Sequence, residues 1–301
     1  MKKTIGLARK TVQILGIDVD STEVDRVLTA VEEKVSYNSL ELNSSRKFYI
    51  VTPNPELILM AQEDRELKKA LNSTEFSIPD GIGLSQAARF LSLPAPKNII
   101  ARFFVTLVQG AVVGLATFFN RSWLMQEIKP LKGRLLFVEL MKLANKRGWK
   151  VFFLGGESNE AIVAASKISL KYRNIKIKAE PGPMFNNDGE PRSERDRELY
   201  SDVVKKINNF NPHLLIVCLQ DPKEEKFVYK NHKKLNIGGA AAFGGTFRYI
   251  AGLSKLPPEW MGELGLEWVW RLIKEPFRLK RILNAFPIFP IRVWKHKLFN
   301  S

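Results

Sequence analysis

Several polar residues stand directly after short apolar runs, where the strands of a sheet would end. Thr52 and Asn54 follow the run Phe48–Val51, and Asp80 follows the run Phe76–Ile78. Open α/β sheets bind ligands beyond the carboxyl ends of their strands, so this placement predicts one shared site. Later apolar runs add further residues to the set: Gly155, Gly156, Gln220, Gly244 and Gly245.

Asp80 is the residue of this set best suited to proton transfer. Pro79 and Gly81 on either side predict a tight bend that would hold the carboxylate at a strand end. A carboxylate in that position can act as a general base on a hydroxyl group if partial burial tunes its pKa. The alternative is an Asx-turn residue that only orders the bend.

Strand-like apolar runs alternate with helical patterns along most of the chain. This alternation is typical of an α/β fold with a mostly parallel sheet and helices on both faces. We expect strands at Phe48–Val51, Phe76–Ile78, Lys150–Leu154, Ile175–Ala179, Leu214–Leu219 and Ala240–Phe243. We expect helices over Asp20–Lys34, from Pro55 through Ala70, and over Leu135–Arg147, Glu157–Tyr172 and Arg195–Phe210.

Several common site types are excluded by the sequence. There is no G-x-G-x-x-G after a strand, no G-x-x-x-x-G-K-[ST] and no G-x-S-x-G. The single cysteine, Cys218, excludes a disulfide framework and a cysteine-based metal cluster. The three histidines share no ligand spacing, so no zinc site is expected.

The 301-residue chain is strongly basic, with 47 lysines and arginines against 31 acidic residues and a net charge of +16. Residues 271–301 hold eight of these cations and one glutamate, interleaved with aromatic residues such as Phe286 and Trp294. This pattern favours an anionic membrane surface or a phosphorylated substrate. The alternatives are a solvated basic tail, or a helix that packs its aromatic residues on the core. No motif typical of nucleic-acid binding accompanies the charge.

An apolar segment without charge covers Phe103–Phe119, and basic residues flank it on both sides. Its length is at the lower limit for a helix that spans a membrane, and Gly110 and Gly114 have the spacing that allows close helix contact. Expected strands lie both before and after it, and a single crossing would separate them. An interfacial or membrane-dipping element, or a helix packed on a partner subunit, is therefore favoured over a span.

The first residues do not have the pattern of a secretory signal. Arg9 and Lys10 interrupt the apolar stretch that follows Lys2 and Lys3, and no A-x-A-like site follows. We therefore expect a cytoplasmic protein that associates peripherally with the cytoplasmic face of the membrane.

A series of motifs, in order along the chain, resembles the WecG/TagA/CpsF family of glycosyltransferases, also called glycosyltransferase family 26. The resemblance covers roughly Ile14 to Arg281, and the block at residues 265–281 is its most specific part. The motifs are T-P-N-P-E, P-D-G-I-G, F-F-L-G-G, D-P-K-E-E, F-G-G-T-F-R-Y-I-A-G and G-L-E-W-V-W-R-L-I-K-E-P-F-R-L-K-R.

This resemblance implies a Rossmann-like core over residues 1–255, with the apolar insertion at about 98–128. It implies a basic, helical, membrane-docking appendage over residues 256–301. The implied reaction is transfer of an N-acetylhexosamine-type sugar (ManNAc, ManNAcA or similar) from a UDP-sugar to a sugar on a polyprenyl diphosphate. It is an inverting, metal-independent reaction that builds teichoic-acid linkages, common antigen or capsule. The family resemblance also allows homo-oligomers.

The same resemblance suggests roles for particular residues. Asp80 would be the general base, with Thr52 and Asn54 placing substrate beside it. Arginines of the appendage would bind the lipid diphosphate, since the guanidinium fork matches phosphate oxygens. The implied substrate-binding residues are Thr52, Asn54, Gly155, Gly156, Gln220, Lys223, Glu225, Arg271, Arg278 and Arg281.

The chain also departs from the family pattern. Asp221 and Glu224 stand where the family usually has Gly and Gln, and Arg248 replaces a carboxylate. The usual R-x-P is Lys255-Leu256-Pro257, and the usual R-x-x-G-x-D-L block is degraded to Lys129–Leu136. These changes bear on donor recognition more than on the base. An alternative reading is a weakly active or non-catalytic relative that binds lipid-linked glycan or a partner enzyme.

Overall fold

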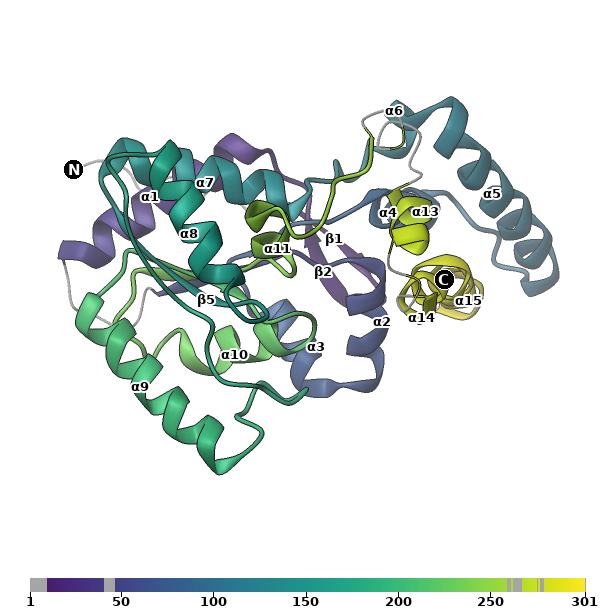
Figure 1. The fold of residues 1–301 in the computed structure, drawn as a ribbon. Coiled ribbons are helices and arrows are strands. Elements are labelled where there is room, and N and C mark those ends of the chain that lie inside the picture. Colours follow the sequence, from purple (N-terminus) through teal and green to yellow (C-terminus); the bar gives the residue numbers. More distant parts are fainter. Residues whose placement is uncertain are drawn as a thin grey trace.

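The computed structural model describes residues 10–40, 47–258, 261, 267–274, 276 and 279–300. An α/β core and a layer of helices lie at opposite ends of the molecule (Figure 1). The strands are β1 (Thr11–Ile14), β2 (Ile17–Asp20), β3 (Phe48–Val51), β4 (Phe76–Ser77), β5 (Lys150–Gly155), β6 (Lys176–Glu180), β7 (Leu214–Cys218) and β8 (Gly239–Ala242).

The helices fall into two groups along the chain. The first group is α1 (Val24–Leu40), α2 (Pro55–Glu63), α3 (Arg65–Asn72), α4 (Ile82–Ser92), α5 (Ile99–Phe119), α6 (Arg121–Leu124) and α7 (Gly133–Arg147). The second group is α8 (Glu160–Lys171), α9 (Glu194–Phe210), α10 (Lys223–Asn231), α11 (Thr246–Ala251), α13 (Glu267–Lys274), α14 (Leu279–Leu283), the kinked turn η3 (Asn284–Ile288) and α15 (Phe289–Asn300).

Six strands form one sheet in the order β4-β3-β8-β7-β5-β6, and every neighbouring pair is parallel. Side chains alternate between the two faces of a strand. In β3, Tyr49 and Val51 enter one core cluster, whereas Phe48 and Ile50 enter the other. Burial on both faces explains why the strands are continuous apolar runs, and the predicted parallel α/β sheet is confirmed.

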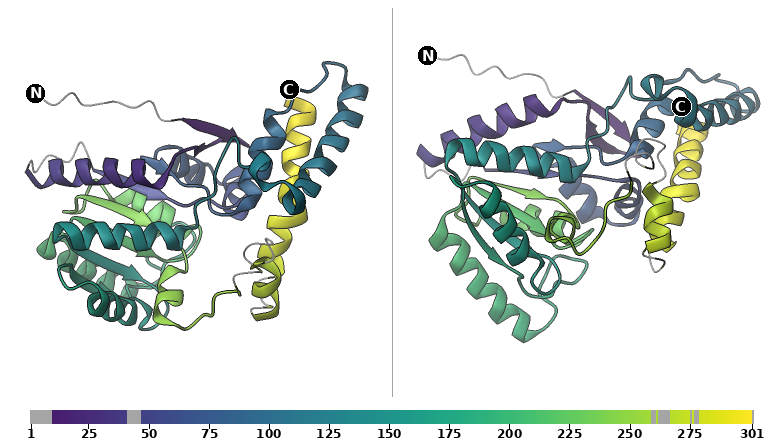
Figure 2. Two further views of the ribbon diagram at one scale, coloured as in Figure 1. Left: turned by 90° about the horizontal axis from the view of Figure 1, so that it is seen from above. Right: turned by 45° about the horizontal axis from the view of Figure 1, so that its top comes forward.

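Helices cover both faces of this sheet (Figure 2). Leu57 of α2, Leu67 of α3 and Phe227 of α10 pack in one core cluster. Val27 of α1 and Phe247 of α11 pack in the other, together with residues of α7 and α8. The carboxyl ends of β3, β4, β7 and β8 lie at one edge of the sheet, facing the helical layer that α4, α5, α14 and α15 form (Figure 1).

The start of the chain differs from the prediction. The run before the first helix is an antiparallel hairpin of β1 and β2, with a two-residue turn at Leu15-Gly16. Both turn residues have positive φ, 51° and 76°, which is the geometry of the tight hairpin turns that follow strand twist. Leucine is rare at a position of positive φ, so the turn could not be predicted from its residue types. The first helix therefore begins at Val24 rather than at Asp20.

One predicted helix is two helices. The pattern from Pro55 through Ala70 breaks at Asp64, which has an extended backbone conformation. The Asp64 carboxylate accepts a hydrogen bond from the backbone N–H of Leu67 at 2.9 Å and so begins α3.

The apolar insertion forms α5, which packs on α4 and α15 at the end of the molecule (Figure 2). Polar contacts hold these helices together. Arg102 donates to the carbonyl oxygen of Leu298 at 3.1 Å, and the indole N–H of Trp294 donates to the Thr106 hydroxyl at 3.1 Å. The buried Lys297 ammonium donates to the Gln109 amide oxygen at 2.9 Å and to the carbonyl oxygen of Phe90.

The other face of α5 is exposed and apolar. Phe104 is 61% exposed, Val108 63% and Phe119 84%. By length and composition α5 could cross a membrane, and only 22% of the residues in its most apolar stretch are buried. However, β3 and β4 before α5 and β5, β7 and β8 after it form a single sheet. A single crossing would place those strands on opposite sides of a bilayer, which the sheet does not allow.

Candidate active site

A cleft of about 780 Å³ opens at the carboxyl edge of the sheet. Its walls come from the ends of four strands and from the helical layer, including the carboxyl end of α5 and the turn η3. Of the residues predicted to form a site, Thr52, Asn54, Asp80, Gln220 and Arg281 all line this cleft.

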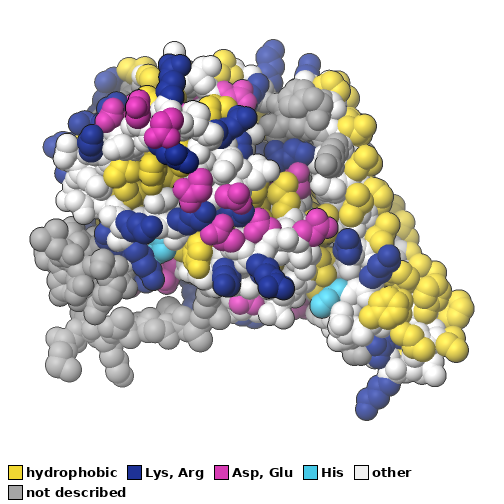
Figure 3. All heavy atoms as spheres, turned by 90° about the horizontal axis from the view of Figure 1, so that it is seen from below, with side chains coloured by type: hydrophobic (Ala, Val, Ile, Leu, Met, Phe, Trp, Pro, Cys, Tyr) yellow, Lys and Arg dark blue, Asp and Glu magenta, His cyan; other side chains and the backbone are white. Residues whose placement is uncertain are grey.

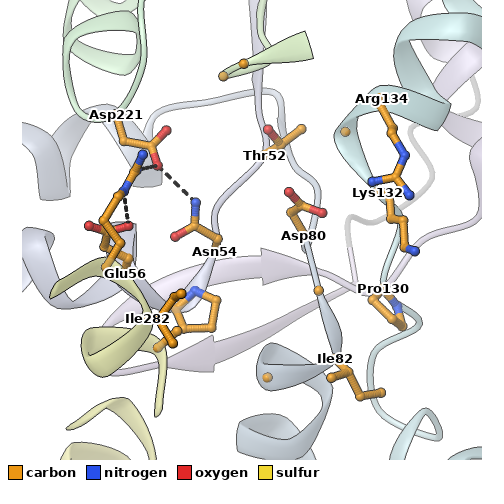
Figure 4. A pocket seen from close by; sticks show the side chains of 18 of the residues that line it. Thr52, Asn54, Glu56, Asp80, Ile82, Pro130, Lys132, Arg134, Asp221 and Ile282 are labelled. Atoms are coloured by element: carbon orange, nitrogen blue, oxygen red, sulfur yellow. Dashed lines mark hydrogen bonds and ion pairs between the residues drawn. The ribbon is translucent and has the colours of Figure 1, made fainter. Parts of the chain in front are cut away.

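Asp80 lies in the open part of the cleft, and its carboxylate points toward Thr52 (Figure 4). The backbone N–H of Asp80 donates to the carbonyl oxygen of Pro53 at 2.8 Å, and the carbonyl of Pro79 accepts from Leu131 at 2.9 Å. Gly81 has φ +94°, a conformation that favours glycine, and it begins α4. The bend predicted from Pro79 and Gly81 therefore exists, and neighbouring segments hold it on both sides.

Thr52 and Asn54 lie next to Asp80 and are fixed by the backbone around them. The Thr52 hydroxyl donates to the carbonyl oxygen of Ala242 at 3.3 Å. The side-chain oxygen of Asn54 (Oδ1) caps α2 by accepting from the backbone N–H of Leu57 at 2.9 Å. This leaves the side-chain N–H group of Asn54 directed toward Asp221 on the same side of the cleft, and it donates to that carboxylate at 3.0 Å (Figure 4).

Arg281 of α14 joins this network from the helical layer. Its Nη2 donates to the Asp221 carboxylate at 2.9 Å, and its Nε donates to the Glu56 carboxylate at 2.6 Å. Burial alone lowers the pKa of the Arg281 guanidinium, but Asp221 and Glu56 outweigh it and raise that pKa above its usual range. The guanidinium is therefore charged and has two carboxylate partners in this structure.

The opposite wall of the cleft is basic. Lys132 and Arg134, at the start of α7, lie on the far side of Asp80 from Asn54 and Asp221 (Figure 4). Arg121 and Arg248 also line the cleft. Sequence reasoning did not select Lys132, Arg134 or Arg121. The only signals were their positions in the sequence. Arg121 directly follows the apolar segment, and Lys132 and Arg134 lie in the block that resembles the family pattern poorly.

Comparison with known proteins bears on the identity of this site. A sequence profile of the "Glycosyl transferase WecG/TagA/CpsF family" matches residues 12–110 and 94–301, which is nearly the whole described chain. The chain belongs to this family. It is thus a glycosyltransferase, and the resemblance seen in the motifs is confirmed.

Two curated relatives have the same name, N-acetylglucosaminyldiphosphoundecaprenol N-acetyl-beta-D-mannosaminyltransferase. The protein from Bacillus subtilis (strain 168) is 30% identical over 248 residues, which are 82% of this chain and 79% of the relative. The protein from Staphylococcus aureus (strain MW2) is 25% identical over 287 residues, which are 95% of this chain and 93% of the relative.

Within this WecG/TagA/CpsF glycosyltransferase, Glu224 stands where the family pattern has Gln. Its two carboxylate oxygens accept from the backbone N–H groups of Leu219 (2.9 Å), Gln220 (3.1 Å) and Gly244 (2.6 Å). A glutamine has one oxygen and would turn an N–H group toward one of these donors. Burial, followed by the nearby Asp221 carboxylate, raises the pKa of Glu224 to about 8. Glu224 thus joins the loops after β7 and β8.

Glu225 is buried beneath the cleft and does not line it. One of its carboxylate oxygens has no hydrogen-bond partner among the described residues. Burial, together with Glu224 and Asp221, raises the pKa of Glu225 well above its usual range. The three carboxylates lie close enough to surround a cation. Asp221 and Glu224 are already engaged by N–H donors, however, so the donor set does not call for a metal.

The glycine pair after β5 also lies outside the cleft lining. Gly155 has φ +109°, and a Cβ there would lie 2.4 Å from the carbonyl oxygen of Cys218. The N–H of Gly156 donates to that same carbonyl at 2.6 Å. The pair therefore allows a close approach of β5 and β7, which is a packing role. Substrate binding by Gly155 or Gly156 stays a prediction.

Three cationic residues complete the predicted set. Lys223 is half-buried at the start of α10 and does not line the cleft. Arg278 lies outside the described residues, as does the side chain of Arg271. The division of the chain at residues 255 and 256 also stays a prediction. The described part of the predicted appendage packs against α2, α4 and α5.

Proposed function

We propose that this glycosyltransferase transfers an N-acetylmannosamine-type sugar from a UDP-sugar to an acceptor sugar on a polyprenyl diphosphate. The observation that carries the proposal is the position of Asp80, beside Thr52 in a cleft at the carboxyl edge of a parallel sheet. The names of the curated relatives support the choice of sugar and of a GlcNAc-diphospholipid acceptor.

The proposed chemistry is a single displacement with Asp80 as general base. The acceptor hydroxyl oxygen forms a bond to the anomeric carbon of the donor sugar, and Asp80 removes the hydroxyl proton. The bond from that carbon to the UDP oxygen breaks, and its electron pair leaves with UDP. Attack opposite the leaving group inverts the configuration of the anomeric carbon.

The basic wall is suited to stabilise the leaving diphosphate. Lys132 and Arg134 lie across the cleft from the Asn54–Asp221 pair, so negative charge that develops on UDP would meet cations on that side. Charge-assisted hydrogen bonds from such side chains are stronger than neutral ones.

We further propose that the helical layer lies on the cytoplasmic face of an anionic membrane. Apolar side chains gather along the edge of the molecule that α5 and α15 form, with Lys and Arg side chains beside them (Figure 3). On α15 itself, Arg292 and Lys295 are exposed next to the exposed Ile291 and Phe299. Apolar side chains flanked by cations match the interior and headgroups of an anionic bilayer surface.

Liposome sedimentation tests this surface. Leu107→Glu with Leu115→Glu places two charges on the exposed face of α5, and should reduce binding to anionic vesicles at least tenfold. The control is Leu170→Glu. The Leu170 side chain is as exposed as those of Leu107 and Leu115, but it lies on α8, which packs against the sheet. Equal binding by the double variant and wild type would contradict the proposed membrane surface.

Release of UDP tests the reaction. Wild type is incubated with a panel of UDP-sugars and a GlcNAc-diphospholipid of short chain length, and Asp80→Asn is compared with it. We expect Asp80→Asn to lower kcat by roughly 10²- to 10⁴-fold, as loss of a general base does. The control Asp202→Asn removes an exposed carboxylate on α9 and should leave kcat unchanged. Full activity of Asp80→Asn would reject Asp80 as the base.

A further inference from the structure

The apolar insertion contributes directly to the wall of the cleft. Gly114, Thr117 and Phe118 from the last turns of α5 line it, and so does Arg121 at the start of α6. Ile282 of α14 and Phe286 of η3 line the same cleft. The insertion is therefore part of the site as well as part of the outer helical layer.

Arg121 is held in place by the end of α5. Its Nε donates to the carbonyl oxygen of Thr117 at 2.9 Å. Asn120 ends α5 and caps α6 by accepting from the backbone N–H of Trp123 at 3.2 Å, which fixes the backbone on either side. The Thr117 hydroxyl in turn accepts from the amide of Gln86 on α4. These contacts hold the Arg121 guanidinium in position at the wall of the cleft.

One nitrogen of the same guanidinium has no hydrogen-bond partner among the described residues. Nη2 of Arg121 is buried and makes no hydrogen bond, and no carboxylate among the described residues pairs with Arg121. Two other arginines of the cleft are paired with carboxylates. Arg281 has Glu56 and Asp221, and Arg248 has Glu157 at 3.4 Å. A buried donor without an acceptor is unfavourable, and an anion that reaches it would remove that cost.

We propose that Arg121 binds a diphosphate group of a substrate. A guanidinium offers parallel N–H donors that match phosphate oxygens, and this one lies in the cleft that contains Asp80. The proposal rests on the proposed function, because that reaction places one diphosphate in the donor and another in the lipid-linked acceptor. Phe118, which also lines the cleft, gives the lipid-linked diphosphate an apolar route toward the exposed face of α5.

Calorimetric titration of the full chain tests the proposal without relying on catalysis. Farnesyl diphosphate and UDP are titrated separately into wild type, Arg121→Ala and Arg121→Lys. We expect Arg121→Ala to weaken binding of at least one ligand by roughly 10- to 100-fold, the effect of losing hydrogen bonds to a charged group. Arg121→Lys keeps the charge but lacks the fork, and should fall between the two.

The two ligands identify the source of the diphosphate. A loss confined to farnesyl diphosphate assigns Arg121 to the lipid-linked acceptor, and a loss confined to UDP assigns it to the donor. Losses for both indicate a subsite that the substrates share. The control Arg195→Ala removes an exposed cation of α9 outside the cleft, and should bind both ligands as wild type does.

Unchanged binding of both ligands by Arg121→Ala overturns the proposal, as does a wild type that binds neither. Thermal unfolding checks that each variant is folded, and if Arg121→Ala is not, Arg121→Gln takes its place. Failure of the proposed function has a separate signature, namely that wild type releases no UDP from any UDP-sugar while the binding results stand.

Discussion

The contact between Arg281 and Glu56 joins the carboxyl-terminal helices to the sheet domain, and its strength can be measured. Arg281 of α14 donates from Nε to the Glu56 carboxylate of α2 at 2.6 Å. The two residues are 225 positions apart in the chain. Arg281→Ala, Glu56→Ala and the double variant form a mutant cycle that isolates this pair.

The expected coupling energy follows from the burial of the pair. A hydrogen bond between charged groups contributes about 1.5–3 kcal/mol when it is well buried. The Glu56 side chain is 11% exposed and the Arg281 side chain 32% exposed, so water weakens the contact in part. We therefore expect a coupling energy of about 1–2 kcal/mol. Arg281→Ala also removes the contact with Asp221, and should cost about 2–3 kcal/mol in all.

The assay is unfolding by heat and by urea, with hydrogen exchange as a local readout. A loss of 2–3 kcal/mol corresponds to a fall in Tm of about 4–6 °C for a chain of this length. Arg281→Ala should also increase exchange in residues 279–300, because α14 and α15 follow the lost contact. Exchange in β5 and β7, at the centre of the sheet, should stay slow.

A matched control separates burial from mere charge pairing. Arg197 and Glu194 on α9 make a contact of 2.7 Å between the same residue types, but their side chains are 67% and 77% exposed. Their cycle should give a coupling energy of about 0–0.5 kcal/mol. If both cycles gave the same energy, or if Arg281→Ala left exchange in residues 279–300 unchanged, the reasoning from burial would be refuted.

Four further predictions concern the helical layer and the sheet. Burial lowers the pKa of Lys297 to about 8, so the native state holds fewer protons than the unfolded chain between about pH 8 and 10.5. The unfolding free energy of wild type should therefore rise relative to Lys297→Met over that pH range; parallel curves would contradict this. Gly155→Ala should lower the unfolding free energy by more than about 2 kcal/mol, because the new Cβ would meet the carbonyl oxygen of Cys218. Gly114→Ala, with open space around its Cβ, should instead raise it by about 0.5–1 kcal/mol. Gly114→Leu should raise KM for the lipid-linked acceptor without lowering Tm, and an unchanged KM would count against α5 as part of the site.

The sheet and the centre of the cleft could be predicted because both follow from local patterns. Buried parallel strands appear as continuous apolar runs, and their carboxyl ends must meet at one edge. Thr52, Asn54 and Asp80 therefore came together as expected. The bend at Asp80 was also readable, because Pro79 and Gly81 restrict the backbone at that point.

The rest depends on contacts between distant segments, which no local pattern encodes. Nothing near Arg281 in the sequence indicates that Glu56 and Asp221 neutralise it. The close approach of β5 to β7 at Gly155 could not be predicted either, because it depends on where the carbonyl of Cys218 lies in the fold. Arg121 was missed because its value as a ligand comes from burial at the end of α5, and burial follows from the fold.

The pairing of α5 with α15 also has a consequence for synthesis of the protein on the ribosome. About 170 residues separate the end of α5 from the start of α15, so at about 5–20 residues per second α5 waits roughly 10–35 s for its packing partner. During that interval the side of α5 that α15 later covers stays uncovered, in addition to its exposed apolar face. A nascent chain in this state is a natural client for a chaperone or for the membrane surface itself. Delivery to the bilayer would then begin before the site is complete.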